Sequence, residues 1–205
     1  MSLHLILGPM FSGKTSKLLE IYEKCVLSNI SVLVINHSND TRYSDDMLST
    51  HNKKMIPCVF ANKLNDIFND SKSEFDERNS SYTASNIVSR YDVILINEGQ
   101  FFNDLYDWVK IIVEAFGRKV YVCGLDGDSN RNKFGQMLDL IPICDKVTKL
   151  RSLCVICKNG TKAPFTLRTT PSNNQQVLIG SEDVYKPVCR LCYSYNTVCF
   201  NEQIV

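Results

Sequence analysis

The clearest chemical signal in the sequence is a glycine-rich segment that ends in lysine and threonine. Residues 8–15 match the pattern G-x-x-x-x-G-K-[ST], in which backbone amides cradle phosphate oxygens. The lysine of this pattern contacts the β- and γ-phosphates, and its hydroxyl residue can ligate Mg²⁺. Packing alone explains many glycine-rich turns, but a lysine buried there without an anion would be costly. We therefore predict a nucleotide phosphate site formed by Gly8, Pro9, Met10, Phe11, Ser12, Gly13, Lys14 and Thr15.

A second candidate site follows the apolar run at residues 91–96, where the chain continues Asn97-Glu98-Gly99-Gln100. An apolar strand that delivers acidic or amide side chains at its end has the form of a Walker B segment, which holds magnesium in ATP-binding proteins. From the residue types alone, Glu98 is a candidate general base. The same carboxylate could instead cap the following helix or hold magnesium.

Four of the nine cysteines form two C-x-x-C pairs with 31 residues between them. This separation is longer than in most zinc ribbons, but each C-x-x-C pair is a standard zinc knuckle. A redox disulfide would need only one pair, so we predict a tetrahedral zinc site. Its role is structural, because four protein ligands leave no open position for water. The predicted ligands are Cys154, Cys157, Cys189 and Cys192, and we interpret the other five cysteines as buried or spare thiols.

Composition favours a small-molecule enzyme. The chain has 205 residues and a net charge of +1, so it has no overall basic field to attract a nucleic acid. The first apolar run begins almost at Met1 and leaves no room for a secretory leader, and no run approaches the length that spans a membrane. We expect a cytoplasmic protein in a reducing compartment.

Apolar runs predict the elements that would hold these residues. Strands are expected at 3–7, 31–35, 91–96 and 120–125, with a fifth at 146–150, and helices after residue 15, at 62–69 and from 105 to 116. Asn103 would cap the last of these helices. Strands that alternate with helices indicate an α/β fold with a mostly parallel sheet. Residues 36–51 are expected to form a loop, and residues 70–81 a solvated insertion.

The character of the chain changes near residue 150. From Arg151 onward helical periodicity disappears, and the cysteine pairs bracket a segment rich in Thr, Asn, Pro and Gly. We therefore predict two units: an ATP-binding α/β domain at residues 1–150, and a small zinc-binding unit at residues 151–205.

Together these motifs resemble the type II thymidine kinases, a family of zinc-containing deoxynucleoside kinases. The resemblance covers most of the chain and is poorest from 70 to 85. It rests on residues 8–15, 40–44, 50–51, 98–102, 125–127, 134–135, 185 and 188–193. It implies a P-loop NTPase-like core that binds ATP with Mg²⁺, and a zinc-anchored loop, the lasso, that closes over thymidine.

By position, the resemblance implies that Glu98 takes the proton from the thymidine 5′-hydroxyl while Lys14 stabilises the transferring phosphoryl group. Asn97 and Gln100 would lie beside the nucleotide, and Arg42 and Arg131 match arginines of the phosphate and closing-loop motifs. The thymine would be surrounded by Met10, Phe101, Phe134, Thr166 and Tyr185, with backbone groups near Leu178 and Ile179. The resemblance further implies a homotetramer, feedback inhibition by thymidine triphosphate (dTTP), and no nucleic-acid or membrane partner.

Two departures from the family leave alternatives open. Asn97 stands where the family usually has Asp, which predicts weaker magnesium coupling, a lower rate or a crippled enzyme. A polar run at residues 128–130 replaces an aromatic residue, which makes another deoxynucleoside a possible acceptor. A degenerate nucleotide-binding zinc protein is the third alternative. A nucleic-acid-binding module is disfavoured, because few cations lie between the knuckles: Lys158, Lys162, Arg168 and Lys186.

Overall fold

The computed structural model describes residues 1–39, 47–49, 54–69, 90–169 and 184–202, and it confirms the predicted α/β class. Six parallel strands form one sheet in the order β5-β2-β6-β7-β1-β8. All five predicted strands are present, and β5 is an addition at one edge. The strands are β1 (Ser2–Leu7), β2 (Val32–His37), β5 (Val59–Ala61), β6 (Val93–Ile96), β7 (Lys119–Gly124) and β8 (Lys146–Lys149).

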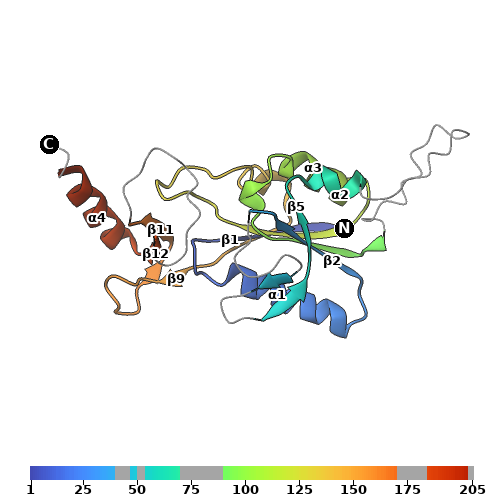
Figure 1. The fold of residues 1–205 in the computed structure, drawn as a ribbon, viewed down its shortest axis with the longest axis horizontal. Coiled ribbons are helices and arrows are strands. Elements are labelled where there is room, and N and C mark those ends of the chain that lie inside the picture. Colours follow the sequence, from blue (N-terminus) through green and yellow to red (C-terminus); the bar gives the residue numbers. More distant parts are fainter. Residues whose placement is uncertain (40–46, 50–53, 70–89, 170–183, 203–205) are drawn as a thin grey trace, which may run out of the picture.

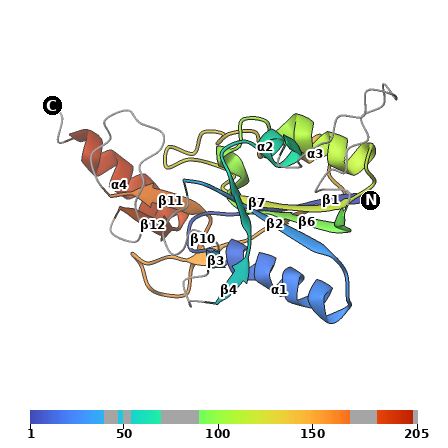
Figure 2. The same ribbon diagram turned by 45° about the vertical axis from the view of Figure 1, so that its right-hand side comes forward.

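Helices cover both faces of this sheet. In Figures 1 and 2, α2 (Leu64–Asn69) and α3 (Leu105–Glu114) lie on one face and α1 (Lys14–Leu27) lies on the other. Alternate residues of β1, β2, β6 and β7 supply the two cores. In β1, for example, Leu3 and Leu5 pack on the α3 side with Trp108, whereas Ile6 packs on the α1 side with Leu18.

The predicted helix that begins at residue 105 is present as α3, with Leu105, Trp108, Val109, Ile112 and Val113 buried, but the predicted cap is wrong. The N-cap residue is Asp104 rather than Asn103. The Asp104 carboxylate accepts hydrogen bonds from the backbone amides of Leu64 at 3.2 Å and Asn65 at 2.9 Å, at the start of α2. Asp104 therefore satisfies amides of a neighbouring helix, a tertiary contact that local sequence rules do not reveal.

Short strands occur where the sequence predicted a loop. Residues 36 and 37 extend β2, and β3 (Met47–Ser49) pairs antiparallel with β4 (Met55–Pro57). The loop prediction is therefore wrong for these residues. Strands of three residues are too short to show an alternating apolar pattern in the sequence. The rest of that segment and the predicted insertion at 70–81 lie outside the described residues.

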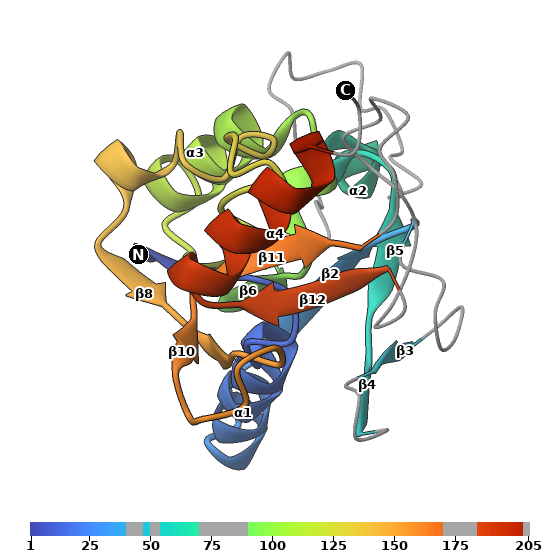
Figure 3. The same cartoon turned by 90° about the vertical axis from the view of Figure 1, so that its left-hand side faces the viewer.

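A second group of elements, which we call the cysteine unit, contains residues 152–169 and 184–202. Two short antiparallel pairs, β9 (Ser152–Leu153) with β10 (Lys162–Ala163) and β11 (Phe165–Arg168) with β12 (Tyr185–Val188), precede α4 (Arg190–Glu202). Figure 3 shows α4 in front of β11 and β12. The expectation that helical character ends near residue 150 is therefore wrong. In the part of α4 whose side chains are described, Tyr193 is buried while Leu191 and Tyr195 are exposed, so the apolar residues there do not mark a single buried face.

Two 3₁₀ helices, η2 (Gly99–Phe101) and η3 (Ile141–Ile143), complete the elements of the described ranges. Among the helices in these ranges, none combines the length and the apolar character needed to cross a lipid bilayer.

Candidate active site

Two strands, β1 and β6, deliver the predicted catalytic segments to one edge of the sheet. Because β6, β7 and β1 are parallel and consecutive in the sheet, their carboxyl ends lie next to one another. The phosphate loop (residues 8–15) follows β1, and the turn at residues 97–100 follows β6, with β7 between them. Parallel α/β sheets bind their ligands at this edge. The fold thus brings together the two segments that carry Lys14 and Glu98.

Two glycines shape the phosphate loop. A Cβ atom at Gly8 would lie 2.7 Å from Ser12 Oγ and 2.8 Å from the Leu150 carbonyl oxygen, so no larger residue fits. Gly13 has a left-handed backbone with a φ of 84° and is the N-cap residue of α1, where it has no side chain to cap the helix. A helix N-terminus reached through such a loop is a ready site for a phosphate.

The polar side chains of this loop fit a bound anion. Lys14 is 8% exposed, and its ammonium donates a hydrogen bond to the Pro9 carbonyl oxygen at 2.8 Å. Within the described residues, the buried Ser12 hydroxyl has no hydrogen-bond partner. A buried ammonium and an unsatisfied hydroxyl in one loop match the needs of phosphate oxygens.

Glu98 is held in place by a buried glutamine. Glu98 has a left-handed backbone with a φ of 52° and precedes η2. Its Oε2 atom accepts a hydrogen bond from Gln100 Nε2 at 2.6 Å, and Gln100 Oε1 accepts one from the Leu125 backbone amide at 2.9 Å. Gln100 is 3% exposed. The structure therefore places the Gln100 amide between the candidate base and the end of β7.

Asn97 is bonded to the ends of two other strands. It is 1% exposed, and its Nδ2 donates to Asn36 Oδ1 of β2 at 2.9 Å. The Cys123 thiol of β7 donates to Asn97 Oδ1, also at 2.9 Å. These contacts give Asn97 a structural role at the sheet edge. Neither Asn36 nor Cys123 was among the predicted site residues, although both lie near the ends of apolar strands, as Asn97 does.

Two aromatic rings lie beside the turn that carries Glu98. The rings of Phe101 and Phe134 meet edge to face, with centroids 5.6 Å apart and an interplanar angle of 88°. The centroid of the His37 ring lies 5.4 Å from that of Phe101. Phe102, the next residue, is fully buried in the core cluster of the α3 face. Of the two consecutive phenylalanines, Phe101 is thus the one that pairs with Phe134.

The remaining predicted acceptor residues lie in or against the cysteine unit. The Met10 backbone amide of the phosphate loop donates to the Thr166 hydroxyl of β11 at 3.0 Å, which joins the two regions directly. Tyr185 begins β12 opposite Arg168 and is 8% exposed. Leu178 and Ile179 lie outside the described residues, as does Arg42.

The four predicted zinc ligands gather at one point. The Sγ atoms of Cys154, Cys157, Cys189 and Cys192 all lie within 4.8 Å of one another. A tetrahedral zinc ion with Zn–S bonds of about 2.3 Å requires sulfur atoms about 3.8 Å apart. The cluster therefore fits such an ion after a small contraction, and the two knuckles approach each other as their spacing predicted.

The pKa shifts of these thiols show that the four sulfur atoms do not all ionise together without a cation. Burial acts to raise the pKa of Cys154, but backbone hydrogen bonds from Cys157 and Cys189 help to outweigh it, and the pKa falls to about 6. Burial and hydrogen bonds with Cys189 and Cys154 raise the pKa of Cys192 to about 12. The cluster alone therefore keeps a thiolate beside a thiol that resists ionisation, and four thiolates together require a metal.

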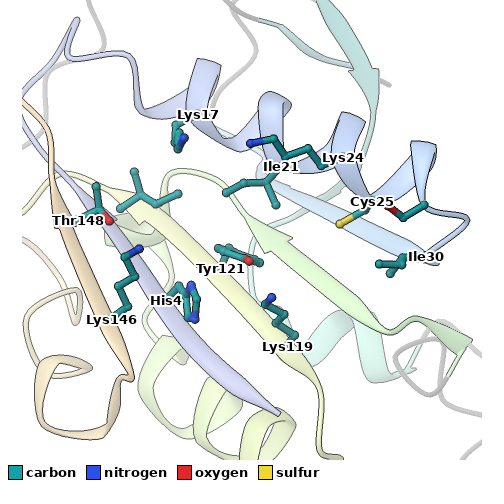
Figure 4. Close-up of a pocket in the computed structure, with 12 residues that line it drawn as sticks. His4, Lys17, Ile21, Lys24, Cys25, Ile30, Lys119, Tyr121, Lys146 and Thr148 are labelled. Carbon is teal, nitrogen blue, oxygen red and sulfur yellow. The ribbon is translucent and has the colours of Figure 1, made fainter.

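A separate groove of about 410 Å³ lies on the α1 face of the sheet (Figure 4). Side chains of α1, β1, β7 and β8 line it, and none of the predicted site residues does. The Lys119 ammonium lies 5.5 Å from the centroid of the Tyr121 ring. Lys17 and Lys24 both pair with Glu20. Because Glu20 balances part of the charge of Lys17 and Lys24, the groove is less positively charged than its lysines alone indicate.

Comparison with known proteins gives one consistent result. A family model described as thymidine kinase matches residues 1–193. Thymidine kinase a of Arabidopsis thaliana is 41% identical over 197 residues, which is 96% of this chain and 76% of the plant protein. The thymidine kinase of Choristoneura fumiferana entomopoxvirus is 36% identical, with 96% and 98% of the two chains covered. The cytosolic thymidine kinase of Bos taurus is 35% identical, with 93% and 71% covered.

Proposed function

The chain belongs to the thymidine kinase family, and we propose that it transfers the γ-phosphoryl group of ATP to the 5′-hydroxyl of thymidine. The observation that carries this proposal is the placement of Glu98 on the same sheet edge as the phosphate loop. A phosphate cradle alone would suit a motor or a switch as well. A positioned carboxylate beside it gives a transferase its base for an acceptor hydroxyl.

On the donor side, the chain's own residues bind and orient the triphosphate. The backbone amides of residues 8–15 hold phosphate oxygens, and Lys14 exchanges its Pro9 carbonyl partner for them. Bound Mg²⁺ would neutralise charge on the β- and γ-phosphates, and Thr15 would hold it. The Asn97 side-chain oxygen accepts a hydrogen bond from the Cys123 thiol, and its second lone pair would be the one available to the metal or to a metal-bound water.

On the acceptor side, Glu98 accepts the proton of the 5′-hydroxyl as the oxygen attacks phosphorus. The hydrogen bond from Gln100 to Glu98 Oε2 keeps the carboxylate oriented in the free enzyme. Met10, Phe101, Phe134, Thr166 and Tyr185 surround the base, and the backbone near Leu178 and Ile179 reads its polar edge. Thr166 already bonds the phosphate loop, so it lies where donor and acceptor sites meet.

We assign Zn²⁺ to the four cysteines in a purely structural role, since four thiolates complete a tetrahedron. In this proposal residues 151–205 act as the unit that closes over the nucleoside, and residues 1–150 bind ATP. We also propose a homotetramer that dTTP inhibits. Light scattering on the purified protein tests the first point, and dTTP titration of the initial rate tests the second.

The test of the base is Glu98→Gln. Because the amide can still accept a hydrogen bond from Gln100, ATP and thymidine should bind as before, while kcat falls by about 10²–10⁴. Glu114→Gln, on the exposed side of α3, is the control and should leave kcat unchanged. Near-normal turnover of the Glu98 variant would remove this residue from the base role.

The test of the acceptor is a panel of nucleosides incubated with the protein, ATP and Mg²⁺, with monophosphate products detected by chromatography. The polar run at residues 128–130 favours a second candidate, a kinase of another deoxynucleoside. Phosphorylation of thymidine ahead of the others supports the proposal, and preference for another nucleoside supports the second candidate. No product with any nucleoside would favour a degenerate nucleotide-binding protein.

A further inference from the structure

The hairpin after β7 is a compact piece built around Asp128. Gly127 and Lys133 form an antiparallel bridge at its base, and the Asp128 amide donates to the Asn132 carbonyl at 2.9 Å. The buried Asp128 carboxylate accepts the backbone amides of Asn130 at 2.9 Å and Asn132 at 2.8 Å. Because these bonds connect its two arms, the hairpin is expected to move as one body.

Two residues of the hairpin contact the cysteine unit. Tyr193 directly follows Cys192 and is 3% exposed, and its hydroxyl donates to the Ser129 carbonyl at 2.6 Å. The Arg131 guanidinium lies 4.2 Å from the centroid of the Tyr193 ring and 5.6 Å from that of Phe165. Arginine is attracted to the faces of aromatic rings and stacks on them. A hydrogen bond and a stacked cation therefore act on the same tyrosine.

The backbone of Arg131 is unusual for a residue with a side chain. Its φ is 66°, in the left-handed region that non-glycine residues seldom adopt. Such a conformation persists where surrounding contacts determine it, and it is often found at functional sites. Figure 2 shows the yellow hairpin extending from the sheet toward α4 and β11. The contacts with the two rings provide a reason for this conformation.

The other end of the hairpin reaches the catalytic turn. Phe134 follows the bridge at Lys133, and its ring packs edge to face on Phe101. Gly135 packs so tightly on Gln100 that a Cβ atom would lie 2.2 Å from the Gln100 carbonyl oxygen. Gln100 in turn holds Glu98. A continuous set of contacts thus runs from the knuckle at Cys192 to the candidate base.

We propose that Arg131 and Tyr193 form a clasp through which the cysteine unit positions the hairpin at residues 127–135. Metal binding at the cysteines fixes the first turn of α4, where the Tyr193 amide bonds the Cys189 carbonyl at 2.9 Å. Tyr193 then holds the hairpin, and the hairpin holds Phe134 on Phe101. Arg131 and Tyr193 are positioning residues in this scheme. The consequence for acceptor binding rests on the proposed function, but the mechanical coupling does not.

Amide hydrogen exchange of the full chain tests the coupling without any activity measurement. In the zinc-loaded protein, Arg131→Ala and Tyr193→Phe should each speed exchange at residues 127–135 by about threefold or more, with the core strands unchanged. Arg190→Ala is the matched control. Its guanidinium also lies over the Phe165 ring, at 4.8 Å, but on the cysteine unit itself. It should leave exchange of the hairpin unchanged.

Zinc removal by a chelator provides the second arm. In the natural sequence, exchange at residues 127–135 should rise when zinc is removed. In Arg131→Ala, zinc removal should add little to the exchange of the hairpin. If zinc removal also unfolds the core strands, the proposal is decided by hairpin exchange in zinc-loaded Arg131→Ala and Arg190→Ala alone. Unchanged hairpin exchange in both clasp variants, or an equal response to Arg190→Ala, would overturn the proposal.

Steady-state kinetics separates a failure of the clasp from a failure of the proposed function. If both hold, Arg131→Ala should raise KM for thymidine by about 3- to 10-fold, with KM for ATP nearly unchanged. Faster hairpin exchange without thymidine phosphorylation in any variant would refute the function and leave the clasp intact. Normal kinetics together with unchanged hairpin exchange would refute the clasp and leave the function intact.

Discussion

The sheet core buries far more apolar side chain than the cysteine unit does. Among the described residues, the clusters on the two sheet faces contain 20 and 10 buried residues, and the cluster of the cysteine unit contains six, two of them metal-ligand candidates. Burial of one large aliphatic or aromatic side chain stabilises by about 1.5–3 kcal/mol. Six residues cannot offset the ordering of that much chain. We therefore expect the core to fold on side-chain packing and the cysteine unit to depend on metal.

The same difference divides the chemistry between the two regions. The phosphate loop and Glu98 are attached to buried strands, so their positions follow from the sheet. The proposed acceptor residues Thr166 and Tyr185 belong to the cysteine unit. We therefore expect the proposed donor site to depend on the sheet, and the proposed acceptor site to depend on the cysteine unit and its metal as well.

Cys189→Ser should have the largest effect, because it removes a proposed ligand from the one cysteine cluster in the described ranges that could hold a metal ion. Structural zinc binding contributes about 10–16 kcal/mol, and whole domains have about 5–15 kcal/mol of stability. Hydrogen exchange should show loss of protection in the cysteine unit and retention in β1, β6 and β7, with zinc content reduced. Cys144→Ser, at a half-buried cysteine away from the cluster, is the control. Full protection of the unit in the Cys189 variant would show that its packing suffices without zinc.

Gly135→Ala should lower the free energy of unfolding of the sheet core without any effect on metal content. The left-handed backbone of Gly135 and the short distance from a Cβ atom to Gln100 predict a loss of about 1–3 kcal/mol in urea unfolding. Gly117 is a matched control, because its φ of 66° is close to the 55° of Gly135 but a Cβ atom there meets nothing within 4 Å. Equal losses in the two alanine variants would mean that backbone conformation, rather than the contact with Gln100, sets the cost.

Thr166→Val tests the hydrogen bond between the two regions. Valine keeps the shape of threonine but leaves the Met10 amide without its acceptor, which should cost about 1 kcal/mol. KM should rise for ATP as well as for thymidine, since the phosphate loop loses a contact. Thr166→Ser retains the hydroxyl and should behave like the natural protein. A change confined to thymidine would limit Thr166 to acceptor binding.

Asn97→Asp should have the smallest effect on activity, although a carboxylate at this 1% exposed position costs stability until a cation balances its charge. The Asn36 amide can reverse to donate to the new carboxylate, and the Cys123 thiol can still donate to it. Added negative charge at the sheet edge should lower the magnesium concentration at half-maximal rate by about threefold. Asn36→Asp places a carboxylate on β2 and is the comparison. An unchanged magnesium titration would show that position 97 does not act on the metal.

Much of the fold and site was predictable from local pattern. The strand runs, the buried stripe of α3, the phosphate loop and the paired cysteines each depend on residues close together in the chain, or on a spacing that one rule describes. Asp104, Gln100 and Tyr193 show what local rules miss. Asp104 is the N-cap residue of α3, but its carboxylate accepts hydrogen bonds from backbone amides at the start of α2. Gln100 and Tyr193 act through backbone groups of Leu125 and Ser129, which carry no side-chain signal.

By itself, the sequence determined the chemistry available to this protein: a phosphate loop with Lys14, a carboxylate at Glu98 and four thiols in two knuckles. Residue type and short spacing suffice for these, because each is local chemistry. Only the tertiary structure decided that β7 lies between the donor loop and the base, that Asn97 bonds Asn36 and Cys123, and that Arg131 stacks on Tyr193. The physical reason is that strand order and side-chain contacts depend on packing between residues far apart in the chain.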